Sequence, residues 1–162
     1  MQKPRERRYW LFKSEPSVYG WEHFEKDGLT LWSGVRNYQA RNLLRDDVRV
    51  GDLVLFYHSN ADPTAIVGIA RVVAGAKPDP TQFDRTSPYY DDGSTEAAPR
   101  WFGVEIAPVV RIDPPLTREQ LKAETALADM MLLQRGSRLS VQPVTAAHWN
   151  WIRKRSGLAP GI

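Results

Sequence analysis

The sequence predicts an α+β fold in which a strongly curved β-sheet or small β-barrel is surrounded by several helices. Two apolar runs rich in Val, Ile and Leu, residues 53–58 and 65–74, have the composition of buried central strands. A third segment, residues 8–14, alternates its aromatic side chains between two faces as a strand does. Helical patterns separate and follow these segments, and no internal repeat or linker divides them, so we expect a single domain.

The composition supports a globular domain and excludes several other classes of protein. The 162 residues are 42% hydrophobic and 25% charged, which rules out a collagen, a coiled coil or a largely disordered chain. Cysteine is absent, so disulfides, thiolate nucleophiles and cysteine zinc sites are excluded. The apolar runs are shorter than the roughly 18 residues of a membrane span, and no secretory signal is recognisable. We expect a cytoplasmic protein without a membrane partner, nucleoid-associated in a bacterium or nuclear in a eukaryote.

In the first third of the chain, the patterns predict one strand and two helices. The strand covers residues 8–14. Ser17 is expected to cap a short helix that ends at Gly28, because glycine favours the left-handed conformation that follows a helix. A short apolar run at residues 29–32 is followed by a turn and then by a second helix over residues 35–48. The apolar positions of this segment recur at helical spacing.

The longest break in the pattern follows the two central strands, at residues 76–99. It contains four prolines, and a break of this length in a small domain is usually functional or mobile. Phe83, Tyr89 and Tyr90 lie in it among acidic residues, which suits a segment that packs across a site.

Regular patterns resume after this break. A strand is predicted over residues 100–112, and a capping box that opens at Thr117 begins a helix. Residues 138–144 form a further strand, and Thr145 caps a last helix.

The charge distribution favours an anionic partner. The net charge is only +3 and the sequence pI about 9.3, but the two ends of the chain are basic and the middle is acidic. Arginine outnumbers lysine, and its planar guanidinium suits bidentate phosphate contacts and stacking on bases. We predict a basic N-terminal tail at residues 1–8, a domain over residues 9–155 and a C-terminal tail at residues 156–162.

The sequence offers no convincing catalytic constellation. His58 and Ser59 are adjacent, but neighbouring strand residues point to opposite faces and cannot act as base and nucleophile. The three histidines lack the spacing of a metal site, and no phosphate-binding glycine loop is present. We therefore predict a protein that is not an enzyme and uses neither a metal nor a cofactor.

Two short segments instead have the chemistry of base recognition. Residues 32–42 (WSGVRNYQARN) combine an indole, two guanidiniums and three carboxamides around a turn into a helix. Carboxamides pair a donor with an acceptor and so can read a base edge, while tryptophan offers a stacking face. In the second segment, Ser140 and Gln142 alternate with apolar residues. The pattern alone is equally compatible with a structural interpretation. In that case the tryptophan packs in the core and the carboxamides hydrogen-bond to loop backbone.

The same segments resemble the EVE domain, the domain of the thymocyte nuclear protein family and its bacterial relatives. Residues 9–16 (YWLFKSEP) resemble the opening of that domain, and residues 32–42 resemble its WxGVRNYQARN motif. Three further matches follow in the same order, residues 51–59 (GDLVLFYHS), 66–70 (IVGIA) and 138–144 (RLSVQPV). The resemblance spans residues 9–152, nearly the whole chain.

The resemblance implies a PUA-like fold, a small curved barrel ringed by helices, and a non-catalytic module that reads a modified base. In this family and in the related YTH readers of methylated adenine, the base is flipped into an aromatic pocket. Lys13 and Ser14 resemble a Lys-Ser pair beside that pocket, Trp32 resembles its first wall, and Trp101 falls where the second would be. Modified cytosine in DNA is the ligand that the resemblance favours.

Resemblance and residue chemistry together give two sets of candidate site residues. The expected base pocket consists of Lys13, Ser14, Trp32, Ser33, Asn37, Tyr57, His58, Trp101, Ser140 and Gln142. The expected phosphate and backbone contacts are Lys13, Arg36, Arg41, Arg45 and Arg138.

Two other functions stay open at this point. One is an RNA- or tRNA-binding domain of the general PUA type. The other is a small-molecule-binding or hydrolytic domain that uses His58 or Lys13 in the same pocket. An effector protein is a candidate further partner, and the oligomeric state stays open.

Overall fold

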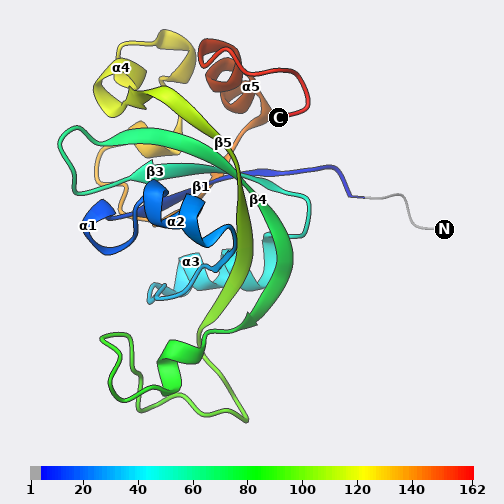
Figure 1. The fold of residues 1–162 in the computed structure, drawn as a ribbon, viewed down its shortest axis with the longest axis vertical. Coiled ribbons are helices and arrows are strands. Elements are labelled where there is room, and N and C mark those ends of the chain that lie inside the picture. Colours follow the sequence, from blue (N-terminus) through cyan, green and yellow to red (C-terminus); the bar gives the residue numbers. More distant parts are fainter. Residues whose placement is uncertain (1–4) are drawn as a thin grey trace.

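The computed structural model describes residues 5–162 and shows a mixed β-sheet with short helices around it (Figure 1). The described residues form the strands β1 (Tyr9–Ser14), β2 (Thr30–Leu31), β3 (Leu53–His58), β4 (Ala65–Pro78), β5 (Phe102–Thr117) and β6 (Val141–Val144). They form the α-helices α1 (Pro16–Tyr19), α2 (Trp21–Asp27), α3 (Tyr38–Asn42), α4 (Arg118–Lys122) and α5 (Ala146–Arg155). Shorter helical turns are the π-helical η1 (Leu43–Asp47) and the 3-10 turns η2 (Pro80–Phe83), η3 (Thr125–Leu127) and η4 (Met131–Leu133). The predicted α+β class is confirmed.

The strands make one sheet in the order β2-β5-β4-β3-β1-β6. β1 and β3 run parallel, with Ser14 opposite His58, and the other neighbouring strands are antiparallel. Parallel neighbours end at the same edge of a sheet, so the chain leaves β1 and β3 side by side. The backbone N–H of Ser59 donates to the carbonyl of Ser14 at 2.9 Å and joins the two exits.

The two longest strands, β4 and β5, form a strongly curved ribbon that runs the length of the molecule (Figure 1). The β4–β5 pairing shifts register at several points, including between Val72 and Ala74. Extra residues of this kind bend a strand and increase its twist. The curvature allows one sheet to enclose apolar residues on both of its faces.

The apolar interior has two clusters, one on each face of the sheet. β1 supplies both by simple alternation: Trp10 and Phe12 lie in one cluster, and Leu11 lies in the other. The alternation predicted for residues 8–14 is therefore confirmed. Because both faces of β1 are packed, its backbone is fixed on both sides up to its C-terminal end.

A buried carboxylate fixes the other end of β1. Asp52 is 1% exposed and accepts hydrogen bonds from the Arg5 guanidinium, the Trp10 indole and the backbone N–H groups of Arg8 and Arg49. Burial acts to raise the pKa of Asp52, but these hydrogen bonds outweigh it and lower the pKa. The side chain of Arg5, part of the predicted basic tail, is thus paired within the protein, while residues 1–4 of that tail lie outside the described residues.

Two helices begin at residues other than those predicted. Ser17 does not cap a helix; α1 begins after Glu15, and α2 begins after Gly20, because Pro16 starts the first helical turn earlier. The helix predicted from residue 35 begins only after Asn37, whose side chain caps it. The predicted stop at Gly28 and the caps at Thr117 and Thr145 are confirmed.

The strand boundaries also differ. β4 extends further than predicted, to Pro78, whereas β5 begins later than predicted, at Phe102, and runs on to Thr117. The intervening loop, residues 79–101, is therefore shifted along the chain and about as long as the sequence suggests. Cross-strand pairing holds the polar ends of these strands in extended form although their composition does not favour it. β6 is shorter than predicted and begins at Val141. In the part of the chain that the structure describes, no helix has the length and apolar character needed to cross a membrane.

Candidate nucleic-acid interface

A groove of about 1060 Å³ lies at the C-terminal end of β1. Its walls come from β1 with α1, from the connection between β2 and α3, and from the turn after β3 together with the loops before β5 and β6. Of the predicted site residues, those that line the groove are Lys13, Ser14, Trp32, Ser33, Arg36, Asn37, Arg138 and Ser140. Segments that are far apart in the sequence therefore meet at one surface hollow.

Lys13 brings a positive charge into the groove. Its backbone N–H donates to the carbonyl of Ser140 at 2.9 Å, and its Nζ donates to the carbonyl of Ser137 at 3.3 Å. Burial, followed by the nearby charge of Arg118, lowers the pKa of Lys13. An anion placed next to this ammonium would relieve both effects, because an opposite charge favours the protonated form.

Ser14 links the groove to the first helix. Its hydroxyl donates to the carbonyl of Tyr19, which holds α1 against the end of β1. With its proton engaged, the Ser14 oxygen can still accept a hydrogen bond from a donor in the groove.

Trp32 forms one wall of the groove and is at the same time packed in the apolar core. Its backbone N–H donates to the carbonyl of Val104 at 2.8 Å, which adds the residue to the edge of the sheet. Trp32 is 7% exposed, and its ring lies 5.4 Å from that of Phe12 and 5.5 Å from that of Phe56, centroid to centroid. Packing on two core rings leaves the indole little freedom to turn.

Tyr89, on the loop between β4 and β5, contributes a further aromatic ring to the groove. This residue lines the groove and is 37% exposed. Its ring packs on Gly34, where an added Cβ would stand 2.9 Å from the ring, and the Gly34 backbone has a φ of +80°. Only glycine satisfies both the close approach and this backbone conformation. Sequence reasoning noticed Tyr89 in the long break but did not place it in the pocket.

A buried ion pair fastens this loop beside the groove. Asp79 is fully buried and accepts hydrogen bonds from the Gly34 N–H at 2.7 Å and from Arg36 Nη1 at 3.0 Å. The backbone N–H and hydroxyl of Thr81 donate to its other oxygen. Burial acts to raise the pKa of Asp79, but the hydrogen bonds from Thr81, Gly34 and Arg36 prevail and lower the pKa.

The Asn37 side chain caps a helix with its oxygen and presents its amide nitrogen to the groove. Its Oδ1 accepts the backbone N–H of Ala40 at 2.9 Å and so caps α3. Its exposed side chain lines the groove, and its amide nitrogen can still donate to a ligand.

Trp101 does not line the groove. It is 5% exposed, its ring stacks on Tyr38 with centroids 4.8 Å apart, and its indole N–H donates to Asp91 at 2.7 Å. Arg36 covers it at 5.2 Å from the ring centroid. The indole of Trp101 thus links the loop to α3. The resemblance implies instead that Trp101 forms the second wall of the base pocket.

Two other predicted pocket residues are buried away from the groove. Gln142 is 1% exposed, and its side-chain amide donates to the carbonyl of Leu139 at 2.9 Å and to the hydroxyl of Ser137. It therefore shapes the loop that contributes Ser140 to the groove. Tyr57 is 3% exposed and lies in the second apolar cluster.

Arg41 and Arg45 lie outside the groove lining. The Arg41 guanidinium lies over the exposed ring of Tyr38, 4.9 Å from its centroid, and donates to the carbonyl of Arg100 at 2.8 Å. Arg45 is exposed and pairs with its neighbour Asp46. Both residues belong to the α3–η1 segment, which continues from the groove residue Asn37.

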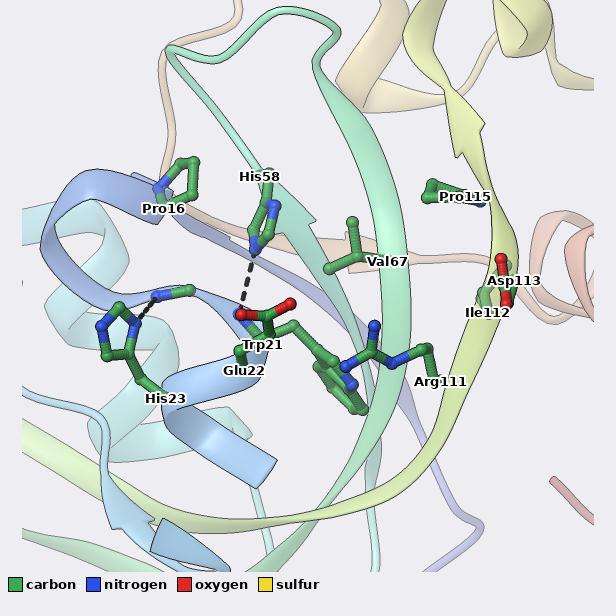
Figure 2. Close-up of a pocket in the computed structure, with 11 residues that line it drawn as sticks. Pro16, Trp21, Glu22, His23, His58, Val67, Arg111, Ile112, Asp113 and Pro115 are labelled. Atoms are coloured by element: carbon green, nitrogen blue, oxygen red, sulfur yellow. Dashed lines mark hydrogen bonds between the residues drawn. The ribbon is translucent and has the colours of Figure 1, made fainter. Parts of the chain in front are cut away.

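His58 lines a separate cavity of about 360 Å³ between α2 and the curved ribbon (Figure 2). Its Nε2 accepts the backbone N–H of Trp21 at 3.1 Å, and burial lowers the pKa of His58. This bond places the proton of the neutral ring on Nδ1. The imidazole thus positions the start of α2, and His58 and Lys13 do not share a pocket. Among residues 5–162, no group of three His, Cys, Asp or Glu side chains could hold a metal ion.

Comparison with known proteins gives a consistent match. The family model described as the EVE domain matches residues 8–155. Thymocyte nuclear protein 1 of Mus musculus is 38% identical over 168 residues, which cover 89% of this chain and 71% of that protein. The chain spans about two thirds of the length of the curated relatives that it matches.

Solved structures show the same architecture. A protein from Pseudomonas putida is 43% identical, with a TM-score of 0.88 over 91% of this chain and 99% of that one. The human THYN1 protein, in a crystal structure in complex with 5-methylcytosine-containing DNA, is 34% identical. Its TM-score is 0.86, over 94% of this chain and 99% of that one. The expected PUA-like architecture is thus confirmed at the level of the fold.

Proposed function

Because the chain belongs to the EVE domain family, we propose that it binds nucleic acid and receives a modified base, favouring modified cytosine in DNA, in the groove at the end of β1. The observation that carries this proposal is the convergence of Trp32, Lys13 and Asn37 on one groove. A relative of the same fold is bound to DNA that contains 5-methylcytosine, which supports this choice of ligand.

The groove supplies the interactions that an extruded base needs. Flipping a base out of a duplex costs a few kcal/mol, and stacking on an aromatic ring returns roughly 1–3 kcal/mol. The indole of Trp32 offers that stacking surface. Ser14 can accept a hydrogen bond and the Asn37 amide can donate one, so the polar edge of the base finds partners of both kinds. A methyl group enlarges the apolar surface that the aromatic wall covers.

The cations around the groove suit the phosphates on either side of that base. Arg138 is exposed at the rim, and Lys13 lies within the groove. Arg41 and Arg45, on the segment that continues from Asn37, already bind the carbonyl of Arg100 and the carboxylate of Asp46, so a phosphate would compete with these partners. Phosphate contacts position the strand and add affinity without reading its sequence.

A hydrolytic function is less well supported. His58 is separated from the groove and its Nε2 already accepts a backbone N–H, so it is not placed to act as a base on a ligand bound beside Lys13. We accordingly propose a non-catalytic reader. An RNA ligand stays the second candidate, because the groove chemistry described above does not distinguish the two sugars.

A titration of matched oligonucleotides tests the proposal. Single-stranded and duplex DNA carrying one 5-methylcytosine, the same DNA with cytosine, and the corresponding RNA are each added while tryptophan fluorescence is followed. We expect the methylated DNA to bind most tightly. The Lys13→Met variant should weaken binding to all ligands, whereas Lys26→Met, which removes an exposed charge from the last turn of α2, should not.

Equal binding of methylated and unmodified DNA would contradict a modified-base reader. Tighter binding of the RNA would favour the second candidate. The His58→Gln variant separates the two cavities, since loss of binding in this variant with an intact fold would point to the wrong site.

A further inference from the structure

The segment between β4 and β5 is built to hold one aromatic ring at the groove. It lies at the end of the long ribbon, next to α3 (Figure 1). Gln82, fully buried, accepts the backbone N–H of Trp101 at 3.1 Å and donates to the carbonyl of Asp79 at 2.7 Å, which closes the base of the loop. The loop is therefore anchored internally, and its position relative to the groove depends on contacts with the β2–α3 connection.

Arg36 makes most of those contacts. Its Nε and Nη2 donate to the carbonyl of Tyr89 at 3.0 and 2.7 Å, and its Nη2 also donates to the hydroxyl of Thr81 at 2.9 Å. Its Nη1 donates to the buried carboxylate of Asp79. The guanidinium also lies 5.6 Å from the Tyr89 ring centroid and 5.2 Å from that of Trp101. These hydrogen bonds occupy the planar fork that a phosphate would otherwise use.

The ring of Tyr89 has no comparable anchor of its own. It fits into the space left by the missing Cβ of Gly34 and stays 37% exposed along the groove. Tyr90 has the same exposure but does not line the groove. The two adjacent tyrosines thus have the same exposure but differ in their access to a base bound in the groove.

We propose that Tyr89 is a specificity-determining residue of the base site, the aromatic wall that the long loop contributes, and that Arg36 is its positioning residue. The inference rests on the proposed function, since it assigns a partner ring to the base that Trp32 receives. It also changes two expected roles. Trp101 anchors the loop, and Arg36 acts on the carbonyl of Tyr89 and on Asp79 and not on a phosphate.

The test compares the affinity of the full chain for DNA oligonucleotides with one 5-methylcytosine or one cytosine. Loss of an aromatic contact to one base corresponds to roughly a 5- to 150-fold loss in affinity. We expect Tyr89→Ala to lose affinity for the methylated oligonucleotide in this range and to lose most of the preference over cytosine. Tyr89→Phe, which keeps the ring, should retain the preference for the methylated oligonucleotide. The matched control Tyr90→Ala should bind both oligonucleotides as the wild-type protein does.

Arg36→Lys tests the positioning role. Lysine keeps the charge but lacks the planar fork, so the preference should fall as in Tyr89→Ala while the slope of log affinity against log salt stays the same. The double variant should lose little more than either single variant, because both changes remove the same wall.

Three results would overturn the inference in distinguishable ways. If the unmodified protein prefers methylated DNA and Tyr89→Ala keeps that preference, Tyr89 is not a wall of the site, although the proposed function stands. If the unmodified protein shows no preference, the proposed function fails and the assignment of Tyr89 fails with it. A reduced salt slope in Arg36→Gln, which removes the charge, would show that Arg36 contacts phosphate, contrary to the role proposed here.

Discussion

Trp32 and Tyr89, two of the aromatic residues that line the groove, are held in place by different means. Trp32 is 7% exposed and is packed against the core rings of Phe12 and Phe56. Tyr89 is 37% exposed and depends on the polar contacts of Arg36 and on the space beside Gly34. One side of the site is therefore part of the folded core, and the other can be altered without disturbing it. Changes at Trp32 should strongly affect both stability and binding, whereas changes at Tyr89 should affect mainly binding.

The largest expected effect follows from Trp32→Ala. Removing a buried tryptophan leaves a cavity and should lower the free energy of unfolding by about 3–5 kcal/mol. The Tyr89→Ala variant should lower it by only about 1 kcal/mol, because the ring loses its packing on Gly34 and its contact with Arg36 but leaves no cavity in the core. Urea denaturation of the two variants measures this difference. Equal destabilisation would show that the two walls are not held differently.

The next largest effect is expected for Asp79→Asn, which weakens the ion pair that fastens the loop. Hydrogen bonds to a charged group contribute about 1.5–3 kcal/mol, and we expect a loss of unfolding free energy in that range. The exposed Asp92 of the same loop provides the matched control, Asp92→Asn, which should be nearly neutral. Denaturation at neutral pH checks both variants.

The same carboxyl predicts a pH dependence. The pKa of Asp79 is lowered in the folded protein, so the unfolded chain takes up its proton first as the pH falls. The stabilisation from this group is therefore present above its usual pKa and is lost as the pH falls through the lower, folded value. We expect Asp79→Asn to lose stability less steeply with acid than the unmodified protein. An identical acid dependence in the two proteins would contradict the role given to this ion pair.

The smallest effect concerns Arg138 at the exposed rim. If it contacts one phosphate, Arg138→Ala should reduce the slope of log affinity against log salt by about 0.7–0.9 and weaken methylated and unmodified DNA equally. Lys122→Ala, which removes an exposed charge from α4, serves as the control. A change in base preference for Arg138→Ala would place this residue in the base site instead.

The sequence predicted the core-supported side of the site better than the loop-supported side. Alternation in residues 8–14 identified β1 with both of its packed faces, and the motif segments contain Lys13, Ser14 and Trp32, which line the groove. Local pattern carries this information because strand periodicity and core packing act together.

The loop side could not be predicted in the same way. The position of Tyr89 depends on a carboxylate at residue 79, a guanidinium at residue 36 and the missing Cβ of Gly34, which meet only in the folded chain. Trp101 and Gln142 illustrate the converse, because a stacking ring and a carboxamide have the same chemistry whether they meet a ligand or tie down a loop. Glycine at residue 34, between a tryptophan and an arginine, was the available signal for a close contact.

A crystal structure of the protein with a short DNA duplex that contains one 5-methylcytosine would show directly whether the groove receives a flipped base. We expect the methylated base to be extruded into the groove at the end of β1, with its ring stacked against Trp32 and its polar edge near Ser14 and Asn37. A base that stays paired in the duplex, or that enters the cavity beside His58, would contradict this expectation.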